Sequence, residues 1–345
     1  MSSGTNISKI TGNDQLSGQL FTFLLLLILA QFSCTLAAQV PPKATVIPAI
    51  TPSPTTLPTP SIEIASTNTP VPDDSTSGKI VFTCQIAGIR YLDQICLINA
   101  DGTGFKRLTT NDNSAHFYPS LAPDGNSVVY SANPTGNYEI YESDLEGNSR
   151  QVTSNLGTLT APEISPDGGR IAFTLGDGVI PSVWLIDRDG TQPRRVYSPG
   201  WDPTWSPDGT QILFASYDQS NAIQLFVVNQ DGSGITQVTQ MPRLRGRSDW
   251  SQQGNWAVTY SGEPWGRELF IVPMNGDDPY QLTPSGGNSQ GPSISPDGRW
   301  VVFTAYYGDI GKDDGCEIYK IRTDGTQLTR LTENEYCDWQ PRWGP

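Results

Sequence analysis

Hydrophobic and polar positions alternate in short runs along residues 78–345, and turn-forming residues separate the runs. Residues 162–174 read PEISPDGGRIAFT, in which Ile171 and Phe173 follow a Ser-Pro-Asp-Gly turn with smaller or polar residues between and after them. A period of two is typical of a β-strand, because successive side chains point to opposite faces of a sheet. Beyond the N-terminus no stretch has the apolar period of a helix. The pattern therefore predicts an all-β chain.

The same element returns along the chain at residues 119–131, 162–174, 203–215, 248–260 and 292–304. Its turn position, Asp or in one case Gln, recurs at 124, 167, 208, 253 and 297, which are 41 to 45 residues apart. A second run that ends in a turn and a short third run, such as VWLIDRDG and RRVY, follow each element. A unit of four short strands with this period predicts a β-propeller blade. In 248–260 the turn reads SQQG, so we expect a looser hairpin there.

The two ends of the repeat region each carry an incomplete unit. Residues 78–84, 95–102 and 106–109 supply three strands without an opening strand, whereas residues 340–343, QPRW, form an opening strand with nothing after it. The two parts add up to one blade. The sequence therefore predicts a six-bladed propeller of four-stranded blades, closed by pairing of the N- and C-terminal partial blades, which protects the sheet edges.

These motifs carry a resemblance to a known family. The repeated P-x-W-S-P-D-G-x-x-I-x-F-x, followed by I-Y-x-x-x-x-D-G and R-x-L-T, resembles the WD40-like (PD40-type) repeat of TolB-like propellers, and is similar to the repeats of prolyl oligopeptidase propellers. The resemblance covers residues 78–345. TolB proteins carry a separate α/β domain ahead of the propeller, and the peptidases carry a catalytic α/β-hydrolase domain. Here a Pro/Thr-rich segment takes the first place and the chain ends at Pro345, so the resemblance implies a scaffold without a catalytic domain.

The N-terminal residues predict export. Residues 20–30, LFTFLLLLILA, form an apolar run that small residues follow, so residues 1–40 are expected to be a signal peptide or membrane anchor. Cys34 is a candidate for lipidation, because lipoproteins carry a Cys directly after such a run. Residues 41–77 are rich in Pro, Thr and Ser and lack aromatic residues, which predicts a disordered linker. We expect a cell-envelope protein, periplasmic or membrane-anchored outside the cytoplasm, or a secreted one.

Charge and acidic residues limit the classes of ligand. The net charge is -14, whereas nucleic-acid binders need a basic surface, so nucleic acid is excluded as a partner. Most Asp residues recur once per repeat at turns, where blade geometry explains them, and no cofactor or metal site is expected. The acidic loop at residues 308–315 is the best candidate for Ca²⁺, but its spacing fits no EF-hand.

One short motif is typical of a hydrolase. Residues 287–291, GNSQG, match the G-x-S-x-G pattern, and a serine hydrolase also needs a base near its nucleophile. The single histidine, His116, precedes the opening strand of another blade, and no helix is expected after Ser289. The sequence therefore predicts that Ser289 is a linker residue and that the protein is not an enzyme.

Apart from Cys34 the chain has four cysteines, an even number that suggests disulfides in an exported protein. Three pairings are possible. A hairpin centred near Arg90 would place Cys84 opposite Cys96, and Cys316 and Cys337 lie in connections on one face. These positions favour Cys84–Cys96 and Cys316–Cys337, with four unpaired thiols as the alternative.

Function is expected on the face opposite the repeated turns, because its loops differ from blade to blade. The candidates for partner binding are the aromatic, basic and histidine residues of these loops: His116, Trp201, Arg243, Arg245, Arg247, Trp265, Tyr306, Tyr307 and Trp339. The alternative is that they pack at the mouth of the channel. The leading hypothesis is a monomeric, non-enzymatic envelope propeller that binds a protein or peptide, with the arginines favouring an acidic partner. The other hypotheses are a glycan- or peptide-binding accessory related to peptidase propellers, and an enzyme that uses the channel.

Overall fold

The computed structural model describes residues 76–86, 92–111, 113–176, 180–307 and 316–345. Every regular element in these ranges is a β-strand. The expected signal or anchor with Cys34, the linker up to residue 75 and the acidic loop at 308–315 lie outside them. Among the described residues no helix is long and apolar enough to cross a membrane.

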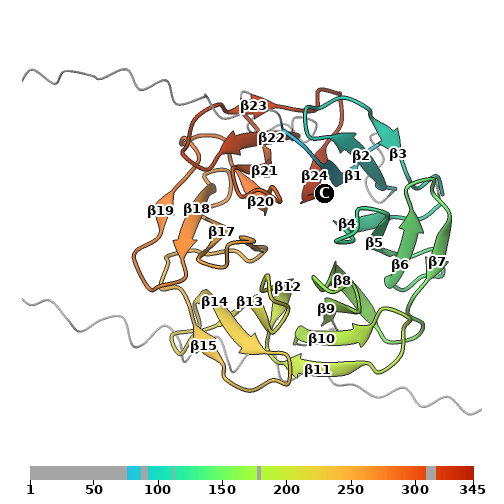
Figure 1. Ribbon diagram of the computed structural model, residues 1–345, viewed down its shortest axis with the longest axis horizontal. Helices are drawn as coiled ribbons and strands as arrows, with labels where there is room; N and C mark the ends of the chain where they lie inside the picture. The colour runs from blue at the N-terminus through green and yellow to red at the C-terminus, as the bar shows by residue number, and fades with distance from the viewer. Residues whose placement is uncertain (1–75, 87–91, 112, 177–179, 308–315) are drawn as a thin grey trace, which may run out of the picture. The chain divides into compact units, whose positions relative to one another are not determined.

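Six four-stranded antiparallel sheets stand around a central axis (Figure 1). The innermost strands are β24 (Asp338–Gly344), β4 (His116–Leu121), β8 (Thr158–Ile164), β12 (Trp201–Trp205), β16 (Asp249–Trp250) and β20 (Gln290–Ile294). The second strands are β1 (Lys79–Cys84), β5 (Ser127–Ala132), β9 (Arg170–Gly176), β13 (Gln211–Tyr217), β17 (Trp256–Ser261) and β21 (Trp300–Ala305).

The third strands are β2 (Gln94–Asn99), β6 (Glu139–Asp144), β10 (Ser182–Asp187), β14 (Ile223–Asn229), β18 (Glu268–Pro273) and β22 (Glu317–Arg322). The outermost strands are β3 (Lys106–Arg107), β7 (Ser149–Gln151), β11 (Arg194–Tyr197), β15 (Thr236–Gln237), β19 (Tyr280–Gln281) and β23 (Thr329–Arg330). We number the blades from the sheet β24-β1-β2-β3, which is blade 1, to β20–β23, which is blade 6.

The ring is closed by the two ends of the repeat region, as the sequence predicts. In blade 1 the strand β24 pairs antiparallel with β1, so that Lys79 lies opposite Gly344 and Ile80 opposite Trp343. The six-bladed, all-β fold expected from the repeats is confirmed. Because β24 is the inner strand of a sheet whose other strands come from residues 79–107, β1 is paired on both sides, with β24 and with β2.

The cores lie between neighbouring blades and are filled from the second strands. Phe82, Phe173, Phe214 and Phe303 occupy the same position of the repeat, and each is almost completely buried. Burying one such side chain contributes about 2 kcal/mol to folding. The alternation seen in the sequence thus places a large side chain in these interfaces in every blade except blade 5, where Thr259 occupies the position.

The SPDG turns are held by their Asp side chains. Oδ1 of Asp167 accepts hydrogen bonds from the Gly169 amide at 2.9 Å and from Ser165 Oγ at 2.5 Å, and Gly168 has a φ of 74°. The turns at Asp208 and Asp297 use the same bonds. Turn geometry therefore accounts for these repeated carboxylates.

The SQQG turn keeps the backbone of the hairpin and loses a side-chain bond. The Gly254 amide donates to the Ser251 carbonyl at 2.8 Å, compared with 2.8 to 2.9 Å in the SPDG turns. The expected loosening of the backbone is therefore not seen. However, Ser251 Oγ is buried and has no hydrogen-bond partner among the described residues, because Gln253 stands where the other turns have Asp.

Two disulfides are present, Cys84–Cys96 and Cys316–Cys337, in the pairing favoured by the sequence. The register of the first hairpin differs from the expectation, since Cys96 lies opposite Phe82 and Cys84 opposite Gln94. The two cysteines are thus diagonal neighbours, with Cα atoms 5.8 Å apart. Cys316–Cys337 joins the segment before β22 in blade 6 to the residue before β24 in blade 1.

Candidate functional site

The propeller has two unlike ends. The turns between first and second and between third and fourth strands, such as 165–168 and 187–190, lie at one end, which we call the turn face. The connections between second and third strands and the linkers between blades, such as 262–267 and 238–248, lie at the other end, which we call the loop face. Antiparallel strands impose this division, because consecutive connections leave opposite ends of a sheet.

Two aromatic candidates meet on the loop face. Trp265 lies in the connection of blade 5 and Tyr306 directly after β21 in blade 6, and their rings meet edge to face with centroids 5.4 Å apart. Trp265 has a φ of 68°, and 46% of its surface stays exposed. A large aromatic side chain that is both oriented and exposed is typical of an interface anchor.

Basic candidates lie beside this pair. Arg243 Nε is 2.8 Å and Arg245 Nη2 is 3.7 Å from the carboxylate of Glu263, which belongs to the same connection as Trp265. The Arg243 and Glu263 side chains are more than half exposed, so their pairing adds little to stability. We call Arg243, Arg245, Glu263, Trp265 and Tyr306 the loop-face patch.

Three further candidates are half-buried in aromatic or backbone contacts. Trp201 packs against Tyr217 with ring centroids 5.1 Å apart, and Trp339 lies 6.3 Å from the ring of Phe117. The Tyr307 hydroxyl donates to the Pro284 carbonyl at 3.2 Å. These three side chains therefore contact Tyr217, Phe117 and Pro284, none of which is a candidate residue.

His116 and Arg247 do not reach the surface, because both are almost completely buried. The His116 ring lies 5.7 Å from the Tyr130 ring, and burial lowers the pKa of His116 to about 4. The Arg247 guanidinium lies 5.2 Å above the ring of Tyr118, inside the channel. Neither residue belongs to an exposed loop surface.

Ser289 is also buried, just before β20. Its hydroxyl donates to Glu268 Oε2 at 3.1 Å and lies 3.5 Å from the Tyr307 hydroxyl. The nearest described side chains thus include no histidine, and a strand rather than a helix follows. This geometry lacks the base and the oxyanion donors of a nucleophile elbow.

The carboxylate beside Ser289 belongs to a repeated clasp that the sequence reading missed. Thr283, the last residue of an R-x-L-T-like run, donates from Oγ1 to Glu268 at 2.7 Å and accepts from the Leu269 amide at 2.9 Å. The same bonds join Thr153 to Glu139 and Thr332 to Glu317. The signal was the Glu that begins the third strand in these three units.

The channel is lined by two positions of the opening strand, which the sequence reading also missed. In most blades the residue before the first Pro of the element has a positive φ, and the ladder shifts register there, as at Tyr118, Asp202 and Gln340. Such a bulge turns side chains toward the axis. The position two residues later faces the axis as well: Ser120, Glu163, Thr204, Asp249, Ser293 and Arg342.

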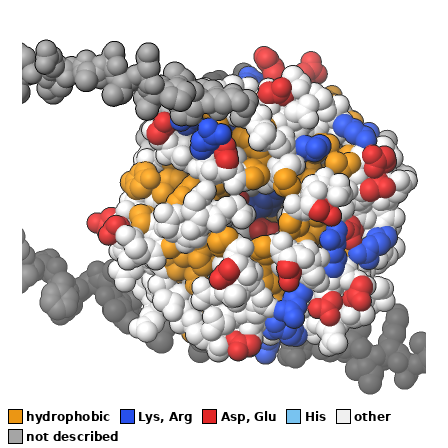
Figure 2. Space-filling model, in the orientation of Figure 1, with side chains coloured by type: hydrophobic (Ala, Val, Ile, Leu, Met, Phe, Trp, Pro, Cys, Tyr) orange, Lys and Arg blue, Asp and Glu red, His pale blue; other side chains and the backbone are white. Residues whose placement is uncertain are grey.

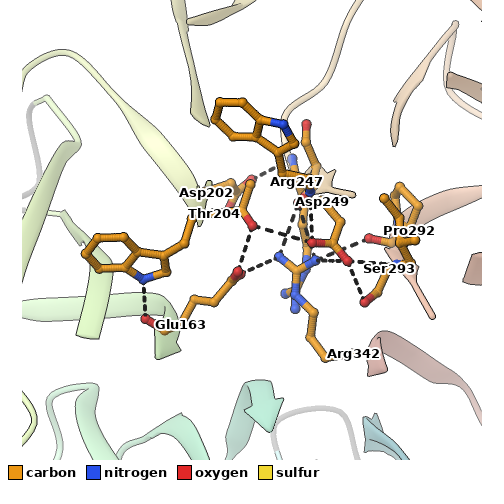
Figure 3. A network of polar contacts seen from close by, with 12 residues as sticks. Glu163, Asp202, Thr204, Arg247, Asp249, Pro292, Ser293 and Arg342 are labelled. Atoms are coloured by element: carbon orange, nitrogen blue, oxygen red, sulfur yellow. Dashed lines mark hydrogen bonds and ion pairs between the residues drawn. The ribbon is translucent and has the colours of Figure 1, made fainter. Parts of the chain in front are cut away.

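A charged network crosses the channel at this second position (Figure 3). Arg342 Nη2 donates to Glu163 Oε2 at 2.9 Å, and its Nη1 lies 3.6 Å from Asp249 Oδ2. Thr204 donates to Glu163 at 2.6 Å, and Ser293 donates to Asp249 at 2.8 Å. Every carboxylate oxygen in this layer has a partner, so the layer stabilises the ring rather than presenting a base.

The neighbouring layer contains Arg247, Asp202 and Tyr118. The Arg247 amide donates to Asp202 Oδ2 at 3.1 Å. Burial raises the pKa of Asp202, and it lowers the pKa of Arg247 to about 10 with help from the nearby charge of Arg342. Burial also raises the pKa of Tyr118 to about 12. The channel thus holds opposite charges that neutralise each other.

A cavity of about 380 Å³ lies on the axis at the turn face, walled by turn prolines and by Trp205, Trp250 and Trp343. Arg342, Glu163 and Asp249 line it. In the view along the axis, Figure 2 shows charged atoms at the bottom of a central hollow with hydrophobic side chains around it. Within the described ranges no three His, Cys, Asp or Glu residues are grouped so that they could hold a metal ion.

Known proteins resemble this chain mainly in the propeller. The chain is 30% identical over 236 residues to the Uncharacterized protein Atu1656 of Agrobacterium fabrum, covering 66% of this chain and 61% of that one. It is 25% identical over 215 residues to the Tol-Pal system protein TolB of Wolinella succinogenes, covering 59% and 50%. It is also 23% identical over 193 residues to the Uncharacterized peptidase YuxL of Bacillus subtilis, covering 43% and 29%. The chain therefore spans less than two thirds of the length of each.

The propeller fold and the sequence family of this chain are both found among known proteins. The structure of TolB from Acinetobacter baumannii superposes with a TM-score of 0.69 at 23% identity, covering 78% of this chain and 67% of that one. The TolB beta propeller domain, PD40, matches residues 73–345. The match spans the six blades described above, and the chain belongs to the TolB beta propeller domain family.

Proposed function

We propose that this protein is a non-enzymatic, TolB-type scaffold that binds a protein partner through the loop-face patch. The observation that carries the proposal is Trp265, which is 46% exposed although its ring is held against Tyr306. Trp, Tyr and Arg contribute most of the binding energy in protein interfaces, and here all three are adjacent. Arg243 and Arg245 outnumber Glu263, so the patch is basic on a chain of net charge -14 and suits an acidic segment of the partner.

The cell envelope is the compartment that we propose for this scaffold. Two disulfides suit an oxidising environment outside the cytoplasm. This supports export, whether the N-terminus is cleaved, lipidated or retained as an anchor.

The test is chemical cross-linking of the full chain in cell envelopes of its source. The double variant Trp265→Ala/Tyr306→Ala should lose a specific cross-linked species, since each anchor contributes about 2 kcal/mol or more to such an interface. Phe105→Ala is the matched control, because Phe105 is 61% exposed but lies beside β3, away from the patch. An unchanged set of cross-links in all three proteins would contradict the proposal.

Absence of catalysis is tested separately at Ser289. We expect the purified protein to hydrolyse no p-nitrophenyl ester or peptide anilide above the buffer rate. Ser289→Ala should lower the free energy of unfolding by about 1 kcal/mol through loss of the bond to Glu268. Hydrolysis that disappears in Ser289→Ala would overturn this part of the proposal.

A second candidate follows from the relation to YuxL, which is described as a peptidase. In that case the propeller is an accessory domain that binds peptides or glycans without catalysis of its own. Cross-linking to a peptidase subunit would favour this candidate.

A further inference from the structure

A second groove lies on the turn face, between blades 5 and 6. It encloses about 550 Å³ and is lined by Trp256, Ile271, Met274 and Tyr280 together with polar groups that include Asn255 and Thr323. None of the described residues that line it carries a charge. Tyr280 is 54% exposed, and Trp256 packs with one side on the core between these blades.

The repeat provides an internal comparison at the junction of blades 2 and 3. There Arg188 Nε lies 2.9 Å from Glu142 Oε1, and its Nη2 lies 2.8 Å from Ser127 Oγ. Arg150 forms an ion pair with the same carboxylate at 2.5 Å and donates to the Arg188 carbonyl at 2.9 Å. Charged side chains thus tie the two blades together and occupy the space between them.

At the junction of blades 5 and 6 the same four positions of the repeat have different side chains. The units are aligned by their turns and strands. In this alignment Trp256 replaces Ser127, Ile271 replaces Glu142, Tyr280 replaces Arg150 and Thr323 replaces Arg188. The ion network is absent from these positions and a groove with aromatic walls remains.

Two other junctions have a basic connection between blades. Arg194 Nη1 donates to the Gln230 carbonyl at 2.5 Å between blades 3 and 4. Lys320 Nζ donates to the Ala100 carbonyl at 3.0 Å between blades 6 and 1, and it lies 4.9 Å from the centroid of Trp300. Blade geometry therefore does not require aromatic, uncharged residues at this place. The groove also includes Asn255, which follows the SQQG turn of blade 5.

The groove has the chemistry of a saccharide site. A pyranose ring has a face of C–H groups that packs on an aromatic ring, and hydroxyl groups that both donate and accept hydrogen bonds. The volume of the groove falls within the range of about 300–1,000 Å³ found for small-ligand pockets. A lining without charge favours a neutral sugar over a uronic or sialic acid.

The orientation of Thr323 separates a sugar from a proline-rich peptide, the other ligand class that aromatic grooves bind. Its Oγ1 lies 3.3 Å from the Arg299 carbonyl and 3.4 Å from the Gly298 carbonyl, so its proton points toward the backbone. The oxygen is left as an acceptor. Each sugar unit has several hydroxyls that can donate to it, whereas a proline-rich peptide can donate only from its other residues, because proline has no N–H.

We propose that the groove around Trp256 and Tyr280 binds a neutral oligosaccharide of pyranose units with equatorial hydroxyls. Tyr280 supplies the stacking surface, Thr323 accepts a hydrogen bond, and the Asn255 amide provides both a donor and an acceptor. This site lies on the face opposite the loop-face patch and does not depend on partner binding there.

Isothermal titration of the full chain with cellotetraose and with chitotetraose tests the proposal. We expect saturable binding of at least one probe. Tyr280→Ala should weaken it about tenfold, and Thr323→Val, which keeps the shape, should weaken it about fivefold. Phe105→Ala removes an exposed aromatic ring elsewhere and should leave binding unchanged.

Three results would overturn the proposal. The first is no binding of either probe, and the second is equal affinity in wild type and Tyr280→Ala. The third is binding of a synthetic peptide with the sequence of residues 51–60, TPSPTTLPTP, that Tyr280→Ala abolishes while neither sugar binds. Cross-linking through Trp265 would be unaffected by any of these results, so the two proposals can fail independently.

Discussion

Arg342 Nη2 donates to Glu163 Oε2 across the channel, although 179 residues separate the two in the sequence. The closing strand β24 thus brings a positive charge between two carboxylates, those of Glu163 and Asp249. Without it, both carboxylates would be buried close together without a cation in their layer. Ring closure and charge neutralisation of the channel therefore depend on the same strand.

Replacement of Arg342 is expected to be costly. Arg342→Ala should lower the free energy of unfolding by about 3 kcal/mol, because loss of one partner leaves buried charges unpaired. Urea denaturation at pH 7 measures the change. Arg299→Ala, which removes an ion pair with Asp297 in which the Arg side chain is 42% exposed, should cost less than about 1 kcal/mol. If both variants lost the same free energy of unfolding, the buried ion pair in the channel would contribute no more to stability than the exposed pair.

Asp338 makes stability depend on pH. Burial and the nearby charge of Glu317 raise its pKa to about 7. The folded protein therefore holds a proton that the unfolded chain releases near pH 4, so the free energy of unfolding should fall as the pH rises from about 4 to 7. Asp338→Asn should remove this dependence and be more stable than wild type at pH 8 by on the order of 2 kcal/mol. Chemical denaturation at a series of pH values measures the free energy of unfolding of both proteins. If the two proteins showed the same dependence on pH, the assignment to Asp338 would be contradicted.

The two disulfides should differ in their effect. Cys316–Cys337 closes a loop with a sequence separation of 21 and links blade 6 to the closing strand, whereas Cys84–Cys96 has a separation of 12 within blade 1. Cys316→Ser/Cys337→Ser should lose about 3 kcal/mol of stability, and Cys84→Ser/Cys96→Ser somewhat less, because longer loops gain more from closure. Denaturation with and without reductant gives both values. A larger loss in the second pair would speak against loop closure as the cause.

One substitution should stabilise the protein. Gln253→Asp would give Ser251 Oγ the partner that Asp167 gives to Ser165, and would bring the turn back to the repeat pattern. We expect a gain of about 0.5–1 kcal/mol, seen as a higher melting temperature in calorimetry. Gln252→Asp changes the neighbouring exposed position and serves as the control. A gain of the same size there would point to a general charge effect.

Most of the fold could be predicted from the repeats. The contacts made by residues that differ from one repeat to the next could not. Six units, their four strands and the closing pair all follow from a spacing that local propensity and turn chemistry maintain. Glu163 and Arg342 could not be paired from sequence, because each occupies a variable position of its own repeat. Arg247 illustrates the difficulty, since its side chain lies in the channel beside Tyr118 and Asp202, away from the loop face where its neighbours Arg243 and Arg245 lie.

The candidate surface was predictable only in part. Loop variability pointed to Trp265 and Tyr306, which meet on the loop face. The burial of His116, in contrast, depends on packing against Tyr130 from the adjacent strand. The groove at Tyr280 was missed because a single aromatic residue in an outer strand has no signal of its own. It stands out only when the contacts of all six blades are compared.

Closure through β24 has a consequence for how the protein is made. Residues 338–344 are synthesised after every other described strand of the ring, and until they arrive β1 has an open inner edge whose backbone groups lack their partners. During synthesis and any translocation the inner edge of β1 thus stays unpaired until β24 is added. During that interval β1 can pair with the same segment of a second chain, and domain-swapped dimers are the expected misassembly product.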